Sequence, residues 1–338
     1  MSIAPFLSGT TLRDRPVLVT GATGFIGGRL CERLAVGEGA RVTGVGRSVD
    51  RARELEDDGV ELVAADLLDT GRFPELLEGR DVVFHAAASF SQDVEQASAL
   101  NVTATGELVR AAAAAGVRRF VLVSSVSVYG EPDRRIVDES TPLALQAEAA
   151  YPRTKARSEV AVQTAAREAG LEFSIVRPAC VFGPRSAIWT VSMWACIREG
   201  VPVLVGDGSG PFGGIYVDDL VDLLLLAAVD DAAVGEAFNA CDAPVPWSEF
   251  ARAYGDPAGI EPRSIAPGEA AALLEAGPAA AGPPDPNYPI LLYVGLAALR
   301  EIVFPADRAG DALGWAPRTG IRGGLERTVA WMRREGLL

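Results

Sequence analysis

Tyr151 and Lys155 are the residues whose types and spacing point first to chemistry. The 338-residue chain contains 31 Lys and Arg residues, and Lys155 is the single lysine among them. Residues four apart on a helix share one face. Pro152 suits the first turn of a helix, so Tyr151 is expected near a helix start. The spacing therefore predicts a phenol and an ammonium side by side.

A phenol is a poor acid–base catalyst at neutral pH, because its ordinary pKa is about 10. A nearby ammonium favours the phenolate and lowers that pKa. Lysine is a compact charge with three donors, so Lys155 can also bind a ribose hydroxyl, a role that the planar fork of arginine fits poorly. The alternative is that the two residues form an accidental pair on a surface helix. The chain uses arginine at every other long cationic position, which makes a chance lysine here less plausible.

A third polar group is needed to polarise a carbonyl. The segment SSVSVYG (124–130) follows the apolar run RRFVLV, which is typical of a buried strand. Its hydroxyls are therefore expected at the carboxyl edge of a parallel sheet, where open α/β folds bind ligands. Ser125 is predicted to donate to the substrate oxygen, with Ser124 and Ser127 as alternatives.

The segment TGATGFIG (20–27) is predicted to bind a pyrophosphate. Gly21, Gly24 and Gly27 fall three apart between a predicted strand and a predicted helix. Glycine permits the tight turn and lets backbone N–H groups approach a phosphate at the helix N-terminus. A merely structural turn is the alternative, but the strand–loop–helix context favours a dinucleotide.

The end of the second predicted strand indicates which dinucleotide. A carboxylate there would bind the ribose 2′-hydroxyl of NAD. The sequence has Gly46, Arg47 and Ser48 instead, which suit a 2′-phosphate, so NADP is favoured and NAD is the alternative. Asp66, at the end of the third strand, is predicted to accept from the adenine amino group or else to start a helix.

The elements that position these groups alternate between strand and helix, as in parallel α/β units. Strands are predicted at 15–20, 41–46, 60–66, 81–87, 118–125 and 173–178, and helices at 25–36, 101–116 and 154–170. Residues 215–229 read as a short strand running into a helix, and 323–338 as an amphipathic helix. The Ala-, Pro- and Gly-rich segment 266–289 is predicted to be a long loop or partly ordered cover, so the role of 266–300 stays open.

These elements predict an α/β fold, a Rossmann doubly wound parallel sheet with a smaller interleaved C-terminal substrate lobe. The dinucleotide-binding domain is expected over 1–178, with 215–240 returning to it. The substrate lobe is expected to comprise 179–214 and 241–338.

Composition excludes several other functions. The net charge of −14 disfavours nucleic acid and anionic membranes as partners. No apolar run approaches the roughly 20 residues of a membrane span, and residues 1–15 lack a secretory pattern, so a cytoplasmic location is expected. The four cysteines are widely spaced and read as free thiols, and no metal site is expected. His85, the single histidine, ends an apolar run and reads as a packed residue, which deprives most hydrolase chemistry of its base.

Taken together, the motifs resemble those of an extended short-chain dehydrogenase/reductase, within the NAD-dependent epimerase/dehydratase-like proteins. The resemblance runs over nearly the whole chain. It includes TGATGFIG, AADLL, HAAAS, NVTATGELV, SSVSVYG, YPRTK, VRPACVFGP, GDGSG, IYVDDLVD and DALGWAPRTGIRGGLERTVAWMRR.

The resemblance implies hydride transfer at the nicotinamide, with Tyr151 as general acid/base, Lys155 lowering its pKa and holding the ribose, and Ser125 orienting the reacting oxygen. It also implies a homodimer through helices near 95–115 and 151–169. The full set expected to bind the cofactor is Gly21, Thr23, Gly24, Phe25, Ile26, Gly27, Arg47, Ser48, Asp66, Leu67, Ala86, Ala87, Ala88, Tyr151, Lys155, Pro178 and Val181. The residues expected to contact substrate are Phe90, Ser127, Cys180 and Phe212.

Departures from the family pattern indicate the branch. Nucleotide-sugar enzymes typically carry Asn where this chain has Cys180, and an Arg shortly after the GDGS turn, where this chain continues Gly-Pro-Phe-Gly-Gly (210–214). A sugar diphosphate needs such charge-assisted donors. Dehydratases usually place Thr, Asp and Glu at 125–127, where this chain has Ser, Val and Ser. The Arg-Pro strand end at 177–178 and several aromatic residues resemble the hydroxysteroid dehydrogenase and dihydroflavonol reductase side.

The sequence thus predicts an NADP-dependent reductase or dehydrogenase, acting on a ketone or secondary alcohol of an apolar, non-nucleotide molecule that is steroid-, flavonoid- or polyketide-like. One alternative is an NAD-dependent nucleotide-sugar 4-epimerase. Another is a non-catalytic dinucleotide sensor, although such proteins usually lack the Tyr/Lys pair.

Overall fold

The fold is built around a seven-stranded parallel sheet in the order β11-β6-β5-β4-β1-β2-β3. The computed structural model describes residues 6–7, 12–276 and 285–338. The chain order reverses between β1 and β4, which is the doubly wound topology, so the predicted fold class is confirmed. The strands are β1 (Pro16–Thr20), β2 (Arg41–Gly46), β3 (Glu61–Ala64), β4 (Val82–His85), β5 (Arg119–Val123), β6 (Glu172–Pro178) and β11 (Ala237–Ala240).

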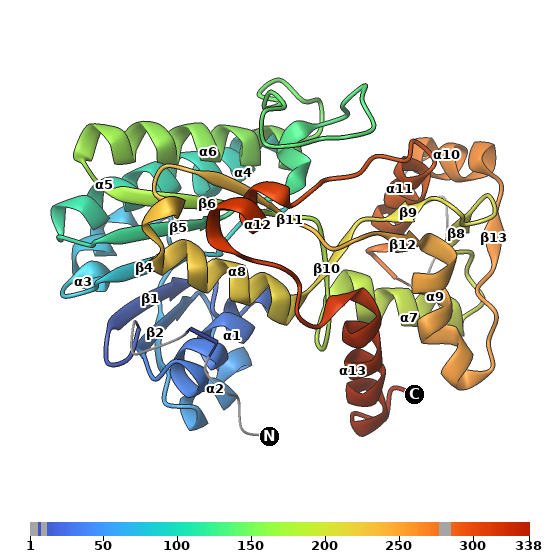
Figure 1. The fold of residues 1–338 in the computed structure, drawn as a ribbon, viewed down its shortest axis with the longest axis horizontal. Helices are drawn as coiled ribbons and strands as arrows, with labels where there is room; N and C mark the ends of the chain where they lie inside the picture. The colour runs from blue at the N-terminus through green and yellow to red at the C-terminus, as the bar shows by residue number, and fades with distance from the viewer. Residues whose placement is uncertain (1–5, 8–11, 277–284) are drawn as a thin grey trace.

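All six predicted strands of the first half are present, the third, fourth and fifth shorter than expected. The apolar runs of β1, β4 and β5 are buried on both faces, as parallel sheets between two helical layers require. Figure 1 shows α5 and α6 above the sheet and α1 and α8 below it. The helices of this part are α1 (Phe25–Glu32), α2 (Glu54–Asp57), α3 (Phe73–Leu77), α4 (Val94–Ser98), α5 (Thr105–Ala114), α6 (Ala150–Ala169), α8 (Val217–Val229) and α12 (Asp307–Leu313).

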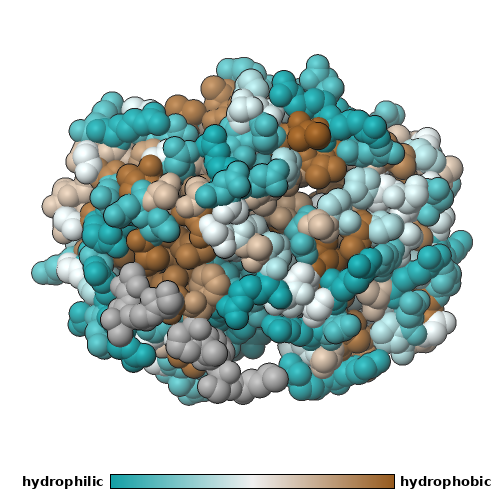
Figure 2. All heavy atoms as spheres, viewed as in Figure 1, coloured by the Kyte–Doolittle hydropathy of each residue, from teal (hydrophilic) through white to brown (hydrophobic). Residues whose placement is uncertain are grey.

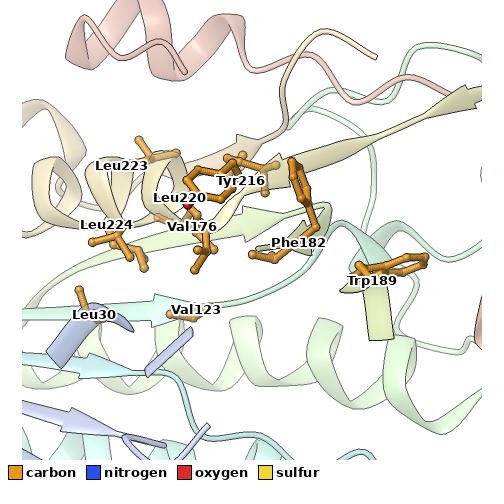
Figure 3. Packing of buried hydrophobic residues seen from close by; sticks show 14 of the residues in the cluster. Leu30, Val123, Val176, Phe182, Trp189, Tyr216, Leu220, Leu223 and Leu224 are labelled. Atoms are coloured by element: carbon orange, nitrogen blue, oxygen red, sulfur yellow. The ribbon is translucent and has the colours of Figure 1, made fainter. Parts of the chain in front are cut away.

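The segment 214–240 passes from the smaller lobe back to the sheet. β10 (Gly214–Tyr216) pairs with β7 (Cys180–Phe182), the chain then enters α8, and β11 adds to the sheet beside β6. Figure 3 shows Leu220, Leu223 and Leu224 of α8 packed near Leu30 and Val176, in one cluster with Phe182 and Trp189 of the lobe. This continuous apolar core holds the lobe against the Rossmann domain.

The lobe is assembled from short strand pairs and helices around an aromatic core, on the right in Figure 1. Trp247 and Phe250 of α9 contact Phe212 there. The elements are β7, β10, β8 (Leu204–Val205), β9 (Pro211–Phe212), β12 (Val245–Pro246), β13 (Ser264–Ile265), α7 (Met193–Arg198), α9 (Trp247–Gly255), α10 (Pro267–Ala276), α11 (Tyr288–Ala298) and α13 (Gly320–Arg334).

The prediction of a long loop over 266–289 is wrong for the described residues. α10 and the start of α11 occupy this segment, while 277–284 lie outside the described residues. Pro267 and Pro289 stand in the first turns of these helices, where proline is tolerated, and Ala and Leu between them favour helix. The prolines therefore mark helix starts.

Asp219 of α8 fixes the last helix of the chain. Its carboxylate accepts from the backbone N–H groups of Arg318, Thr319 and Gly320, each at 2.9 Å, at the start of α13. The indole of Trp315 donates to the Asp219 carbonyl at 3.2 Å. An acidic group at a helix N-terminus is stabilising, so these contacts explain how 315–320 locks the C-terminal helix to α8.

The face of the molecule in Figure 2 carries hydrophilic residues with separate apolar patches between them. Among the described residues, no helix is long and apolar enough to cross a membrane.

Candidate active site

The glycine loop joins β1 to α1 and is closed by backbone contacts. Gly21 has φ +75°, and a Cβ there would lie 2.7 Å from the Ala87 nitrogen. Gly24 is the N-cap of α1, and no side chain of the described residues caps the first N–H groups of this helix. The loop is therefore a cradle that side chains would fill, which fits a pyrophosphate.

Thr23 lies against the end of β2. A Cβ at Gly46 would be 2.5 Å from the Thr23 methyl group, which explains the glycine before Arg47. Phe25 and Ile26 are half-buried at the start of α1 and pack against the main core.

Replacing Gly27 with alanine should weaken dinucleotide binding by about tenfold or more, because the new Cβ would lie 2.2 Å from the Gly21 carbonyl oxygen and force the loop open. Fluorescence titration with reduced dinucleotide measures the affinity. Gly268→Ala in α10 is the matched control, since its Cβ would meet nothing within 4 Å. Equal affinities of the two variants would contradict a role of the loop in binding.

The segment after β4, which contains the predicted cofactor-binding residues Ala86, Ala87 and Ala88, borders the glycine loop. The Ala86 N–H donates to the Thr20 carbonyl at 3.2 Å, and the Ala87 N–H to the Thr20 hydroxyl at 3.4 Å. These contacts place the three alanines at the carboxyl edge of the sheet, half-buried.

The residues after β2 stand in solvent. Arg47 and Ser48 are exposed, and within the described part of the chain Arg47 forms no ion pair. A cation at this strand end is therefore available to an anionic group of a ligand.

Asp66 and Leu67 follow β3 with different surroundings. The exposed Asp66 carboxylate accepts from the Leu68 N–H at 3.0 Å, a tight turn of its own backbone. The side chain of Leu67 is inside the core between the sheet and α3, so only its backbone remains for a ligand.

Tyr151, Lys155 and Ser125 meet where β5 ends and α6 begins. Tyr151 lies in the first turn of α6, near the helix start as predicted. The Ser125 side chain lies close enough to the Tyr151 phenol to lower the pKa of that group. Ser125 Oγ also accepts from the Ser127 N–H at 3.1 Å. A phenol and a hydroxyl are thus held side by side.

The pKa of Tyr151 differs from the expectation for an activated phenol. Burial raises it to about 12, and only the hydrogen bond from Ser125 opposes that rise. Lys155 is 2% exposed and donates its Nζ to the Val123 carbonyl at 2.8 Å, so the ammonium is directed to the backbone in this structure. Lys155 is therefore not among the causes that act on the pKa of Tyr151 in this structure.

Lys155 itself is strongly perturbed. Burial lowers the pKa of its ammonium to about 8, and attraction by Glu159 partly offsets that effect. A lysine that titrates near neutrality in a site is typical of functional groups.

His85 is a structural residue, as predicted. Its ring nitrogens contact the hydroxyls of Thr20 at 2.7 Å and Thr105 at 2.9 Å. Burial, with repulsion by Lys155 as a smaller cause, lowers its pKa to about 3, so the ring is neutral.

Of the residues predicted to contact substrate, Phe90 and Ser127 lie near Tyr151. The ring of Phe90 is 66% exposed and stacks on that of Tyr151, with centroids 4.9 Å apart. The Ser127 hydroxyl is buried and, among the described residues, has no hydrogen-bond partner. An orphaned hydroxyl beside Ser125 is available to a polar atom of a ligand.

The prediction that Phe212 contacts the substrate is wrong. Phe212 is fully buried in the lobe core and stacks on Phe250 with centroids 3.7 Å apart, so its side chain is not available to substrate. Phe182 and Trp189 belong to the same aromatic core.

Cys180 is half-buried at the start of β7. Burial raises the pKa of its thiol, so the side chain is an uncharged thiol. Pro178 and Val181 are buried at the end of β6 and in β7.

The sequence-based reasoning missed Glu159. This residue is fully buried on α6 and binds both Ser124 and Arg177. A signal was present, because the four-residue spacing of Tyr151 and Lys155 continues to Glu159 on the same helix face.

Comparison with known proteins agrees with this geometry. Residues 17–241 match the NAD dependent epimerase/dehydratase family. The chain is 29% identical over 337 residues to UDP-glucose 4-epimerase of Mycolicibacterium smegmatis, covering 94% of this chain and 98% of that protein. It is 33% identical over 254 residues to 3 beta-hydroxysteroid dehydrogenase/Delta 5-->4-isomerase of Mycobacterium tuberculosis, covering 70% of this chain and 67% of that protein. MoeE5 in complex with UDP-glucose and NAD is similar in structure, with a TM-score of 0.73, 27% identity and coverage of 95% of this chain and 99% of that chain.

The family match contains the glycine loop, the seryl turn after β5 and the Tyr151/Lys155 pair, and it covers more than half of the chain. The residues predicted to hold a dinucleotide and those predicted to handle a proton are thus present together on the fold of the family. The chain belongs to the NAD dependent epimerase/dehydratase family and is an extended short-chain dehydrogenase/reductase, a type of NAD(P)-dependent enzyme.

Proposed function

We propose that this enzyme is an NADP-dependent reductase or dehydrogenase that interconverts a ketone and a secondary alcohol on an apolar, non-nucleotide substrate. The observation that carries the proposal is the exposed ring of Phe90 stacked on Tyr151, which puts an apolar surface directly beside the proposed proton donor. The turn at 206–214, GDGSGPFGG, offers no cation for a sugar diphosphate.

The residues of the site divide the chemistry between them. A bound nicotinamide supplies or accepts the hydride. Ser125 donates a hydrogen bond to the carbonyl oxygen, and Tyr151 gives that oxygen its proton in the direction of reduction. A pKa of about 12 keeps the Tyr151 phenol protonated at neutral pH, as a donor must be. Lys155 holds the ribose with its remaining donors.

The preference for NADP is supported by Arg47. Its guanidinium is exposed after β2 and, in the described residues, not engaged by a carboxylate. The glycine loop beside it would hold the pyrophosphate, with Ser48 as a second donor toward a 2′-phosphate.

Arg47→Ala is expected to weaken NADPH binding by about 10- to 100-fold and to leave NADH binding within about twofold, because charge-assisted bonds to a phosphate are lost. Fluorescence titrations with the two cofactors measure the change. Arg53→Ala is the matched control, since Arg53 is an exposed arginine close by that already pairs with Asp50. A parallel loss of NADH affinity, or none of NADPH, would remove the basis for NADP.

A nucleotide-sugar 4-epimerase is the second candidate, favoured by similarity to UDP-glucose 4-epimerase over 94% of the chain. A reductase consumes its reduced cofactor, whereas an epimerase returns the hydride to the same sugar and consumes none. A panel of steroid-, flavonoid- and polyketide-like ketones, followed by NADPH absorbance with UDP-glucose as control, separates them. Consumption of NADPH with a ketone supports the reductase. Conversion of UDP-glucose to its 4-epimer without net consumption rejects it.

A homodimer and a cytoplasmic location remain proposals. Val160 of α6 is 42% exposed and Ala114 of α5 is exposed, which leaves apolar surface on the two helices expected at a dimer interface.

A further inference from the structure

The carboxylate of Glu159 is a buried junction behind the proposed site. Glu159 is 0% exposed and lies one helical turn after Lys155 on α6. Its Oε1 accepts from the Ser124 hydroxyl at 2.5 Å. Arg177 donates to it three times, from Nε at 3.0 and 3.2 Å and from Nη2 at 2.6 Å. A buried charge with this many partners is tied to its position.

Two consecutive residues, the last of β5 and the first of the turn after it, form hydrogen bonds with side chains of α6. Lys155 binds the carbonyl of Val123, and Glu159 binds the hydroxyl of Ser124. The next residue is Ser125, whose side chain lies close enough to the Tyr151 phenol of the same helix to lower its pKa. The two ties therefore set how Ser125 and Tyr151 stand relative to each other.

Arg177 connects the same carboxylate to a third segment. It is the residue before Pro178, at the end of β6, and its Nη1 donates to the Tyr129 hydroxyl at 2.8 Å. Tyr129 in turn donates to Asn239 of β11 at 2.7 Å. Glu159 thus joins the seryl turn, α6 and β6, the strand that ends at Pro178, a residue predicted to bind the cofactor.

We propose that Glu159 is a positioning residue, which fixes Ser125 against Tyr151 through Ser124 and keeps Lys155 in its charged form. The proposal rests on the proposed function for the roles of Ser125 and Tyr151. Its effect on Lys155 needs no substrate to be measured.

The ionisation of Lys155 depends on the charged and titratable groups around it. On its own helix are Tyr151, which is neutral, and Glu159. His85 of β4 is neutral because its pKa lies near 3, and the charge of Arg177 on β6 is engaged by Glu159. Glu159 is the group whose attraction raises the pKa of Lys155 against burial. Removing that charge must favour the neutral amine.

The single lysine makes the test direct. Protein grown with lysine labelled with carbon-13 at Cε gives one lysine signal, whose shift reports the ionisation of Lys155 without any activity assay. In Glu159→Gln, the midpoint of this titration should fall by about one pH unit or more from the wild-type value.

The matched control is Asp222→Asn. Asp222 is 4% exposed and pairs with buried Arg33 at 2.6 Å, between α8 and the end of α1. This variant also breaks a buried ion pair, but it should leave the lysine midpoint unchanged. If unpaired Arg177 prevents Glu159→Gln from folding, the double variant Glu159→Gln/Arg177→Met removes both charges and should show the same fall. A midpoint within about 0.3 units of wild type in the folded Glu159 variant, or an equal shift in Asp222→Asn, overturns the charge role.

Ser124→Ala tests positioning separately, because it breaks one tie and leaves every charge in place. The lysine midpoint should stay unchanged, while kcat falls by about tenfold or more with KM changed by less than about threefold. An unchanged kcat overturns the positioning role. A wild-type enzyme without reductase activity rejects the proposed function instead, and the lysine titration still decides the charge role.

Discussion

Replacing Tyr151 with phenylalanine is expected to lower kcat for carbonyl reduction by about 10²- to 10⁴-fold, the usual contribution of a positioned general acid. The ring and its stacking with Phe90 are retained, so NADPH affinity should stay within about twofold. The phenolic hydroxyl, whose pKa is lowered by Ser125 against the effect of burial, is the only group removed.

Stopped-flow measurement of NADPH oxidation and fluorescence titration of binding separate the two effects. Tyr254→Phe is the control, because it removes a buried hydroxyl that bonds to Thr190 at 3.2 Å in the lobe core. That variant is expected to be less stable than wild type but to keep the wild-type turnover rate and NADPH affinity. Turnover of Tyr151→Phe at the wild-type rate would refute the assignment of the proton donor.

Lys155→Met should produce an enzyme that is nearly inactive and more stable. The ammonium is buried, and its pKa is lowered from 10.5 to about 8, so below pH 8 the native state bears the full cost of that burial. Between about pH 8 and 10.5 the unfolded chain holds a proton that the native protein has released, so wild-type stability rises with pH in this window. Removing the charge is expected to raise the free energy of unfolding by about 1–3 kcal/mol at pH 7, with kcat lowered by about 10²-fold.

Urea unfolding at pH 7 and at pH 10 measures the free energies of unfolding of wild type and Lys155→Met. The advantage of Lys155→Met over wild type should be largest at pH 7 and shrink at pH 10, where the wild-type lysine is neutral. Lys155→Arg, which keeps a charge at the position, should show no gain. A Met variant less stable than wild type at pH 7 would show that the ammonium is well solvated or fully compensated, contrary to its 2% exposure.

Predictions that depend on local pattern agree best with the structure. The glycine spacing, the apolar strands and the Tyr151 position near a helix start all follow from backbone sterics and periodicity, which a sequence displays directly. The helices α10 and α11 were missed because proline was read as a breaker when it marks a helix start.

Features that arise from packing were not predictable in this way. Phe212 was assigned to a substrate surface, but its burial depends on Phe250 and Trp247, which lie far along the chain. The raised pKa of Tyr151 and the engagement of Lys155 by the Val123 carbonyl depend on how deeply α6 packs against β5. Burial outweighs charge in both cases, and burial is a property of the whole fold.

The central claim is that hydride passes between NADP and an apolar carbonyl while Tyr151 handles the proton. Its most direct test uses NADPH carrying deuterium at the transferable position, with wild-type enzyme and a ketone from the panel. The account predicts an alcohol with one deuterium on the carbinol carbon, formed about 10²- to 10⁴-fold more slowly by Tyr151→Phe. Absence of label in every alcohol product, together with epimerised UDP-glucose, would contradict it.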